Sequence, residues 1–96
     1  MKKFIFLHVG YETPTKEIID AWMKWFESIK SHIVDSGNPF GPGREVTPTG
    51  VKELPHNKEA TTGYTIINAE NMDEAVKIAQ SCPMITAMRV YEAMSM

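Results

Sequence analysis

The chain has 96 residues, which suggests one domain, 1–96, with a single hydrophobic core. Its formal net charge is −2 and its Lys and Arg residues are scattered, so no basic patch indicates nucleic-acid binding. The one cysteine, Cys82, excludes an internal disulfide framework, and no segment approaches the ~20 apolar residues of a membrane span. Composition therefore predicts a cytoplasmic protein that binds neither nucleic acid nor membrane.

The first predicted element is a strand, Lys3–Val9, which is rich in aromatic and β-branched residues and ends at Gly10. Alternation divides it into two apolar faces, Phe4, Phe6 and His8 on one and Ile5, Leu7 and Val9 on the other. We expect the second set to face helices and the first set to face outward.

A helix is predicted next, with Thr13 as its N-cap and Pro14 in the first helical position. Its apolar stripe consists of Ile18, Ile19, Trp22, Trp25, Phe26, Ile29 and Ile33. This spacing is typical of a helix that packs on a core, and Gly37 lies just beyond its predicted end. We expect both Trp22 and Trp25 to pack in the core, with Trp25, at the edge of the stripe, also able to line a cavity.

The second half of the chain predicts a hairpin, a strand, a helix and a last strand. The hairpin spans Glu45–Leu54 with Pro48-Thr49-Gly50 at its turn, and the strand is Gly63–Ala69. Asn71 and Glu74 form a capping-box pattern for the second helix, which Pro83 ends. With a last strand at Ala87–Met94, this order indicates an α+β, ferredoxin-like split βαβ fold. It has an antiparallel sheet with two helices on one face and a hairpin elaboration in the middle.

The face of such a sheet that lies away from the helices has no cover. By alternation it would present Phe4, Phe6, Tyr64, Ile66 and Tyr91, together with His8, Asn68 and Arg89. Because a monomer rarely exposes such an apolar patch, the sequence predicts a homodimer that packs sheet against sheet. A cavity lined by these groups would also suit a small ligand.

The chain resembles the YCII-related family, in particular its DGPF-domain branch, across nearly its whole length. The similar segments, in matching order, are "AWMKWFESI" at 21–29, "DSGNPF" at 35–40, "GYTIINAENMDEAVKIAQSCP" at 63–83 and "RVYEA" at 89–93. The resemblance implies a ferredoxin-like fold that pairs into a dimeric α+β barrel.

Two departures from the family pattern limit what the resemblance implies. The DGPF signature is replaced by the shorter "ELPHNKEATTG" at 53–63. Some YCII-like proteins, among them a dehydrochlorinase, are associated with a His–Asp pair whose histidine lies near the start of the first helix. This chain has Asp20 there, so we do not expect that activity.

The candidate site residues lie on the predicted uncovered face of the sheet and in the Gly/Pro-rich bend at 35–47. His8 is the candidate catalytic base, because histidine titrates near neutral pH; the alternative is a hydrogen-bonded interface histidine. Arg44 would suit a carboxylate, or it is a solvated residue of a stiff connector. The predicted ligand-binding set is His8, Asn38, Arg44, Tyr64, Asn68, Arg89 and Tyr91, with His8, Asn38, Arg44 and Arg89 converging on one anion site.

The other reactive residue types have simpler interpretations. His56 and Glu59 have a spacing of three but no visible third ligand, so we expect neither a metal nor a cofactor. Cys82 lies on the core stripe of the second helix and should be buried.

The sequence thus predicts a homodimer that binds a small carboxylate or aromatic molecule. The two alternatives are a lyase or isomerase that uses His8 as general base, and a non-catalytic regulatory or assembly module.

Overall fold

The computed structural model describes residues 1–95. The elements in chain order are β1 (Lys2–Val9), α1 (Lys16–Ser28), the 3-10 turn η1 (Lys30–His32), β2 (Ile33–Asp35), β3 (Gly43–Thr47), β4 (Gly50–Leu54), β5 (Thr61–Ala69), α2 (Met72–Gln80) and β6 (Ala87–Glu92). No helix in this part of the chain is long and apolar enough to cross a membrane.

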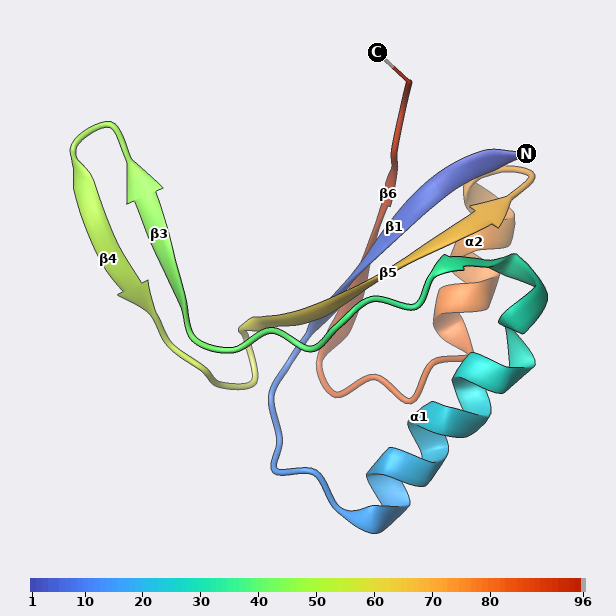
Figure 1. The fold of residues 1–96 in the computed structure, drawn as a ribbon, viewed down its shortest axis with the longest axis horizontal. Coiled ribbons are helices and arrows are strands. Elements are labelled where there is room, and N and C mark those ends of the chain that lie inside the picture. The colour runs from blue at the N-terminus through green and yellow to red at the C-terminus, as the bar shows by residue number, and fades with distance from the viewer. Residues whose placement is uncertain (96) are drawn as a thin grey trace.

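Four strands form one antiparallel sheet in the order β2-β5-β1-β6. Side chains from both α1 and α2 pack in one cluster against β1 and β5, so both helices cover the same face of the sheet. Figure 1 shows α1 and α2 together on one side of the molecule and the β3–β4 hairpin projecting from the opposite end. The predicted α+β, ferredoxin-like architecture with a hairpin elaboration is confirmed.

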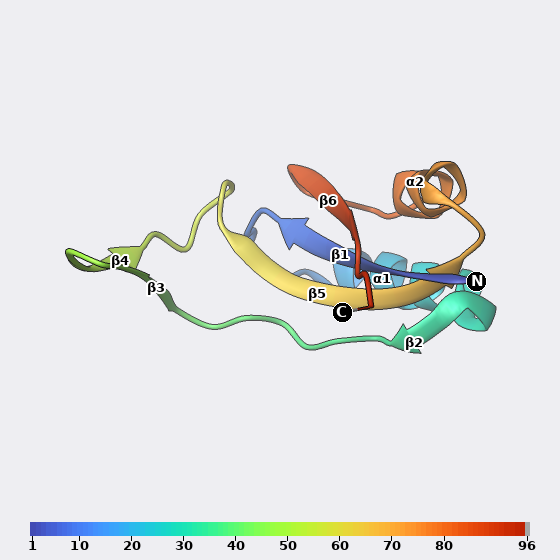
Figure 2. The ribbon, with the colours of Figure 1, turned by 90° about the horizontal axis from the view of Figure 1, so that it is seen from above.

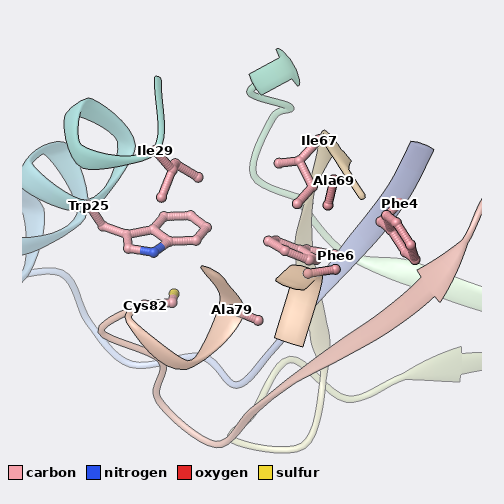
Figure 3. Close-up of a cluster of buried hydrophobic side chains, with 9 residues drawn as sticks. Phe4, Phe6, Trp25, Ile29, Ile67, Ala69, Ala79 and Cys82 are labelled. Atoms are coloured by element: carbon pink, nitrogen blue, oxygen red, sulfur yellow. The ribbon is translucent and has the colours of Figure 1, made fainter. Parts of the chain in front are cut away.

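The core lies between the N-terminal half of β1, the middle of β5 and the two helices. Phe6 of β1 and Trp25 of α1 point toward each other, with ring centroids 6.3 Å apart (Figure 3). Ala75 and Ala79 of α2 are buried in the same cluster, and their small side chains allow α2 to approach the sheet closely. The complete cluster is Phe4, Phe6, Trp25, Ile29, Ile67, Ala69, Ala75, Ala79 and Cys82.

The predicted faces of β1 are wrong. Phe4 and Phe6 are both 0% exposed on the helix-covered face, whereas Ile5 and Leu7 are only partly buried. The register agrees, because Phe4 pairs with the core residue Ile67. Both faces of this strand are apolar, so alternation alone does not identify the inner one, and a one-residue error exchanges every side chain.

The faces of β5 and β6 were predicted correctly. Ile67 is fully buried, and Met88 and Val90 pack against the core. Tyr91 is 53% exposed on the other face, and Arg89 is exposed as well. The face that the helices leave uncovered therefore presents Ile5, Leu7, Tyr64, Ile66, Asn68, Arg89 and Tyr91.

The predicted first helix is two residues too early at its start and too long at its end. Its N-cap is Thr15, whose Oγ1 accepts a hydrogen bond from the Ile18 N–H at 3.3 Å, rather than Thr13. The helix ends at Ser28, and Ile33 begins the short edge strand β2, which the sequence analysis missed. Ile33 matches the apolar spacing of the helix, but it is apolar for another reason: it pairs with the buried Ile67 in the sheet.

Gly37 explains much of the unusual composition after β2. Its φ is 77°, and a Cβ atom there would lie 1.6 Å from the Tyr64 carbonyl oxygen, so only glycine allows this approach to β5. Beyond it, Pro39 bridges to Gly63, and the Phe40 N–H donates to the Thr62 carbonyl at 2.8 Å. The segment 36–40 therefore prolongs β2 along the edge of β5, as Figure 2 shows.

The hairpin β3–β4 forms a separate two-stranded sheet. Thr47 pairs with Gly50 across the turn, which confirms the predicted turn at Pro48-Thr49-Gly50. Arg44 lies 3.9 Å from Glu53 in a cross-strand ion pair between exposed side chains. The hairpin therefore carries Arg44 away from the four-stranded sheet (Figure 1).

Candidate functional site

A cavity of about 640 Å³ lies at the C-terminal end of β1. Its walls come from the N-terminal half of α1, the segment 36–40, the start of β5 and the loop 84–87. The volume is within the range that accommodates a small organic molecule.

The apolar stripe of α1 extends beyond the core on which the helix packs. Its N-terminal part therefore forms one wall of the cavity. Trp25, 3% exposed, and Ile29 fill the core, whereas Ile18, Ile19 and Met23 line the cavity. Ile19 is 49% exposed and Met23 is 65% exposed. The N-terminal half of α1 thus presents apolar side chains to open space.

Aromatic rings surround much of this space. Trp22 packs edge-to-face against His8, with centroids 5.1 Å apart at 70°, and lies 6.1 Å from Phe26. Phe40 and Tyr64, which also contribute to the lining, stack on each other at 5.8 Å and 26°. Such rings provide flat apolar surfaces against which a planar ligand can pack.

His8 is a partly buried polar residue of the cavity lining, and a short chain of hydrogen bonds orients its ring. The Thr65 hydroxyl donates to the Ser36 carbonyl at 3.2 Å, and the His8 Nε2 atom lies 2.9 Å from the same hydroxyl oxygen. The other ring nitrogen, Nδ1, is buried and has no hydrogen-bond partner among the described residues.

Burial lowers the pKa of His8 from 6.5 to about 4. At neutral pH the ring is therefore uncharged, and it is a weak base. A general base works best when its pKa lies near the working pH, so this environment does not favour proton abstraction by His8.

The lining of the cavity carries little charge. Among the described residues that form it there is no Lys or Arg, and Glu12 supplies the one carboxylate. At the rim, Tyr11 and His56 form an edge-to-face pair with centroids 4.1 Å apart. The site therefore suits an uncharged molecule better than an anion.

The structure divides the predicted ligand-binding residues. His8, Asn38 and Tyr64 line the cavity. The remaining four, Arg44, Asn68, Arg89 and Tyr91, do not line it.

The predicted convergence of His8 with Arg89 is wrong. Arg89 pairs with Leu7 in the sheet, whereas His8 pairs with Met88, so the two side chains point to opposite faces. Arg44 is held in the hairpin by Glu53, and only Asn38 accompanies His8 at the cavity.

The main residues that sequence reasoning missed are aromatic. Phe40 was not considered. Both tryptophans were expected in the core, and Trp25 is buried there, whereas the half-buried Trp22 packs against the core and also lines the cavity. The available signal was the length of the apolar stripe on α1, which exceeds what a short sheet can cover.

Two other candidates have structural roles. Cys82 is buried in the core as predicted, and burial raises the pKa of its thiol to about 12, which disfavours the reactive thiolate. His32 bonds through Nδ1 to the Asn68 carbonyl at 3.1 Å. No group of three His, Cys, Asp or Glu side chains within residues 1–95 could hold a metal ion.

The fold is that of a ferredoxin-like α+β protein, with a cavity of about 640 Å³ beside its sheet. A family model for the YCII-related domain matches residues 5–96, and the chain belongs to this family. The narrower assignment to the DGPF-domain branch stays a prediction.

Among solved structures, the chain is similar to the 5-chloro-2-hydroxyhydroquinone dehydrochlorinase from Burkholderia phenoliruptrix AC1100 in complex with 2,5-dihydroxybenzoquinone. The two chains are 21% identical, the match covers 96% of this chain and 93% of that one, and the TM-score is 0.59. This similarity supports the fold. The curated proteins include no match to the chain.

Proposed function

We propose that this protein binds a small, uncharged aromatic molecule in the cavity beside His8 and Trp22. The observation that carries the proposal is a cavity of about 640 Å³ with aromatic walls and no Lys or Arg among its described lining residues. Of the two ligand classes that the sequence suggested, a carboxylate would lack a cationic partner, because Arg44 and Arg89 lie elsewhere.

The dehydrochlorinase of similar fold supports a planar ligand. That protein was solved with 2,5-dihydroxybenzoquinone, which has a flat six-membered ring. A ring of the same shape could pack against the Trp22 and Phe26 rings, which both line the cavity. We do not extend the dehydrochlorinase activity to this chain, because it has Asp20 where the family's helix-start histidine is expected.

A matched pair of probes tests the proposal. We expect 2-naphthol to raise the melting temperature of the wild type, and 2-naphthoate, which has the same ring system with a carboxylate, to have little effect. Ile18→Arg, which places a bulky cation in the wall, should abolish the response to naphthol. Arg44→Ala, in the hairpin, is the control and should respond as the wild type does. Equal shifts with both probes, or none with either, would contradict the proposal.

The two alternative functions have less support. A lyase or isomerase with His8 as general base would require a stronger base than a histidine of pKa about 4. A purely structural module would have no need of an open cavity of this size beside its sheet.

We further propose a homodimer formed through the uncovered face of the sheet, with the corrected set of residues. The proposal is supported by the apolar surface of Ile5, Leu7 and Ile66, which lies on the sheet face that α1 and α2 leave uncovered. The expected species in sedimentation at micromolar concentration has twice the chain mass of 10.8 kDa. Ile66→Lys should dissociate it, whereas Val46→Lys, on the exposed hairpin, should not. A monomer in the wild type would rule the dimer out.

A further inference from the structure

We propose that His8, which lines the cavity, selects ligands that donate a hydrogen bond, because its buried Nδ1 atom is an acceptor without a partner among the described residues. This inference rests on the proposed function and narrows the ligand class to uncharged aromatic molecules that carry a hydroxyl or N–H group. It assigns Thr65 the role of a positioning residue, which determines the ring nitrogen that carries the proton.

The direction of the hydrogen bonds follows from the number of available protons. The Thr65 hydroxyl has a single proton and donates it to the Ser36 carbonyl at 3.2 Å. Toward His8, 2.9 Å away, its oxygen can therefore only accept. His8 must carry its proton on Nε2, and the uncharged ring then has a lone pair on Nδ1.

No residue within 1–95 satisfies this lone pair. Trp25 packs edge-to-face on His8 at 6.3 Å, but its indole N–H is already bonded to the Ser81 hydroxyl at 3.0 Å and the Ile78 carbonyl at 3.3 Å. Trp22 lies against the ring without a hydrogen bond to Nδ1. A buried acceptor without a partner destabilises the protein, so a ligand that supplies the missing donor gains affinity at this site.

Access to Nδ1 requires a small movement. The atom is buried, and the half-buried Trp22 ring packs against the His8 ring, with centroids 5.1 Å apart. Trp22 also lines the cavity, so a ligand that approaches the His8 ring from this side must displace the indole. Binding of a donor should therefore change the environment of Trp22.

The chemistry of the site predicts a clear discrimination. A phenolic hydroxyl gives its proton to Nδ1, whereas the corresponding methyl ether has none to give and leaves the acceptor unpaired. Sites built to pair a substrate hydroxyl reject analogues that lack it more strongly than apolar pockets reject a change in size. The remaining contacts, made by the aromatic walls, are the same for both molecules.

The experiment compares 2-naphthol with 2-methoxynaphthalene by titration calorimetry on the full chain. In the wild type we expect naphthol to bind about ten- to hundredfold more tightly. His8→Phe should bind both probes with affinities within about twofold, because the ring shape is kept and the acceptor is lost. Arg89→Ala, on the opposite face of the sheet, should keep the wild-type preference.

Thr65→Val supplies an independent readout. Nitrogen-15 NMR of the wild type should show the His8 ring protonated at Nε2, and Thr65→Val should shift it toward a mixture of tautomers and weaken the preference for naphthol. Loss of packing alone would not change the tautomer. A wild-type ring protonated at Nδ1 would overturn the inference.

The outcomes distinguish this inference from the function on which it rests. Equal affinity of the wild type for naphthol and its ether would overturn the selectivity and leave the aromatic site standing. Binding of neither probe would overturn both.

Discussion

The two ends of the contact between β1 and α1 differ although both are rich in aromatic residues. At one end Phe6 and Trp25 meet in a filled core (Figure 3). At the other end His8 and Trp22 border a cavity of about 640 Å³. The difference comes from the third partner: α2 contributes Ala75 and Ala79 to the core end, and no residue of α2 lines the cavity. How tightly α1 packs therefore depends on whether a second helix lies beside it, as well as on the apolar residues of α1 itself.

The backbone at the cavity end differs from that at the core end as well. Gly10 and Gly37, the two glycines with positive φ, both line the cavity. They let the chain turn away from the sheet at the end of β1 and press against β5 after β2. We infer that these turns keep the cavity walls in place without a helix behind them.

Truncating the aromatic side chains at each end compares the two regions directly. Phe6→Ala should lower the free energy of unfolding by about 3–5 kcal/mol, because it leaves a void in a fully buried site. Trp22→Ala should lower it by less, about 1–2 kcal/mol, because Trp22 already borders open space. Urea denaturation measures both values. Equal losses would show that the two ends are packed alike.

A charge at Phe6 sharpens the same comparison. Phe6→Asp should prevent folding outright, since it buries an unpaired carboxylate between β1 and α1. A folded, monomeric Phe6→Asp protein would instead place this residue in a subunit interface and contradict the observed faces of β1.

The next effect concerns the backbone at Gly37. Gly37→Ala should destabilise the protein by about 2 kcal/mol or more, because the new Cβ meets the Tyr64 carbonyl and φ is positive. Gly41→Ala is the matched control: no atom lies within 4 Å of its Cβ position, so the change should stay within about 0.5 kcal/mol. Thermal unfolding of both variants checks this. Equal stability of the two would remove Gly37 from the account of the cavity wall.

The pH dependence of stability tests the environment of His8. Because the folded pKa of about 4 lies below the unfolded value of 6.5, the unfolded chain binds a proton first as the pH falls. His8 should therefore reduce stability as pH drops from 6.5 to 4, by at most about 1.4 kcal/mol per pH unit, and have no effect above this window.

The control for this titration is a pair of variants. His8→Gln should remove the slope, whereas His56→Gln, at the exposed rim, should keep it. Denaturant midpoints at a series of pH values measure the effect. An unchanged slope in His8→Gln would mean that the ring is not held uncharged by burial.

The smallest effect is chemical and involves no change in sequence. Cys82, buried in the core with a raised pKa, should react with a thiol reagent only after denaturation. Rapid stoichiometric labelling of the native protein would contradict the burial of Cys82 in the core.

Much of the fold could be predicted from local signals. Asn71 accepts a hydrogen bond from the Glu74 N–H at 2.9 Å, as the capping pattern indicated, and the turn of the hairpin was found from its Pro and Gly. Alternation worked on β6, where Arg89 makes one face clearly more polar, and on β5, where Ile67 was placed in the core. It failed on β1, where Phe6 and Leu7 are equally apolar neighbours and only the tertiary packing determines which is buried.

The site was less predictable because it depends on segments that are distant in sequence. His8 and Asn38 both line the cavity, but the prediction placed their site on the uncovered face of the sheet, whereas His8 lies on the helix-covered face with Met88. Arg44 was not, because the separate hairpin carries it away from the sheet, and the sequence does not specify the direction of a hairpin. The hydrogen bonds that orient His8 through Thr65 and Ser36 required the paired strands to be known.

The most direct test of the central claim is an amide NMR titration of the wild type with 2-naphthol. Gly10, Gly37 and Gly63 line the cavity, whereas Gly43 and Gly50 lie in the hairpin, so the glycine signals report on both regions. We predict that naphthol shifts the first three signals in a saturable way and leaves the other two unchanged. Shifts confined to the hairpin, or spread evenly over the chain, would contradict a ligand site beside His8.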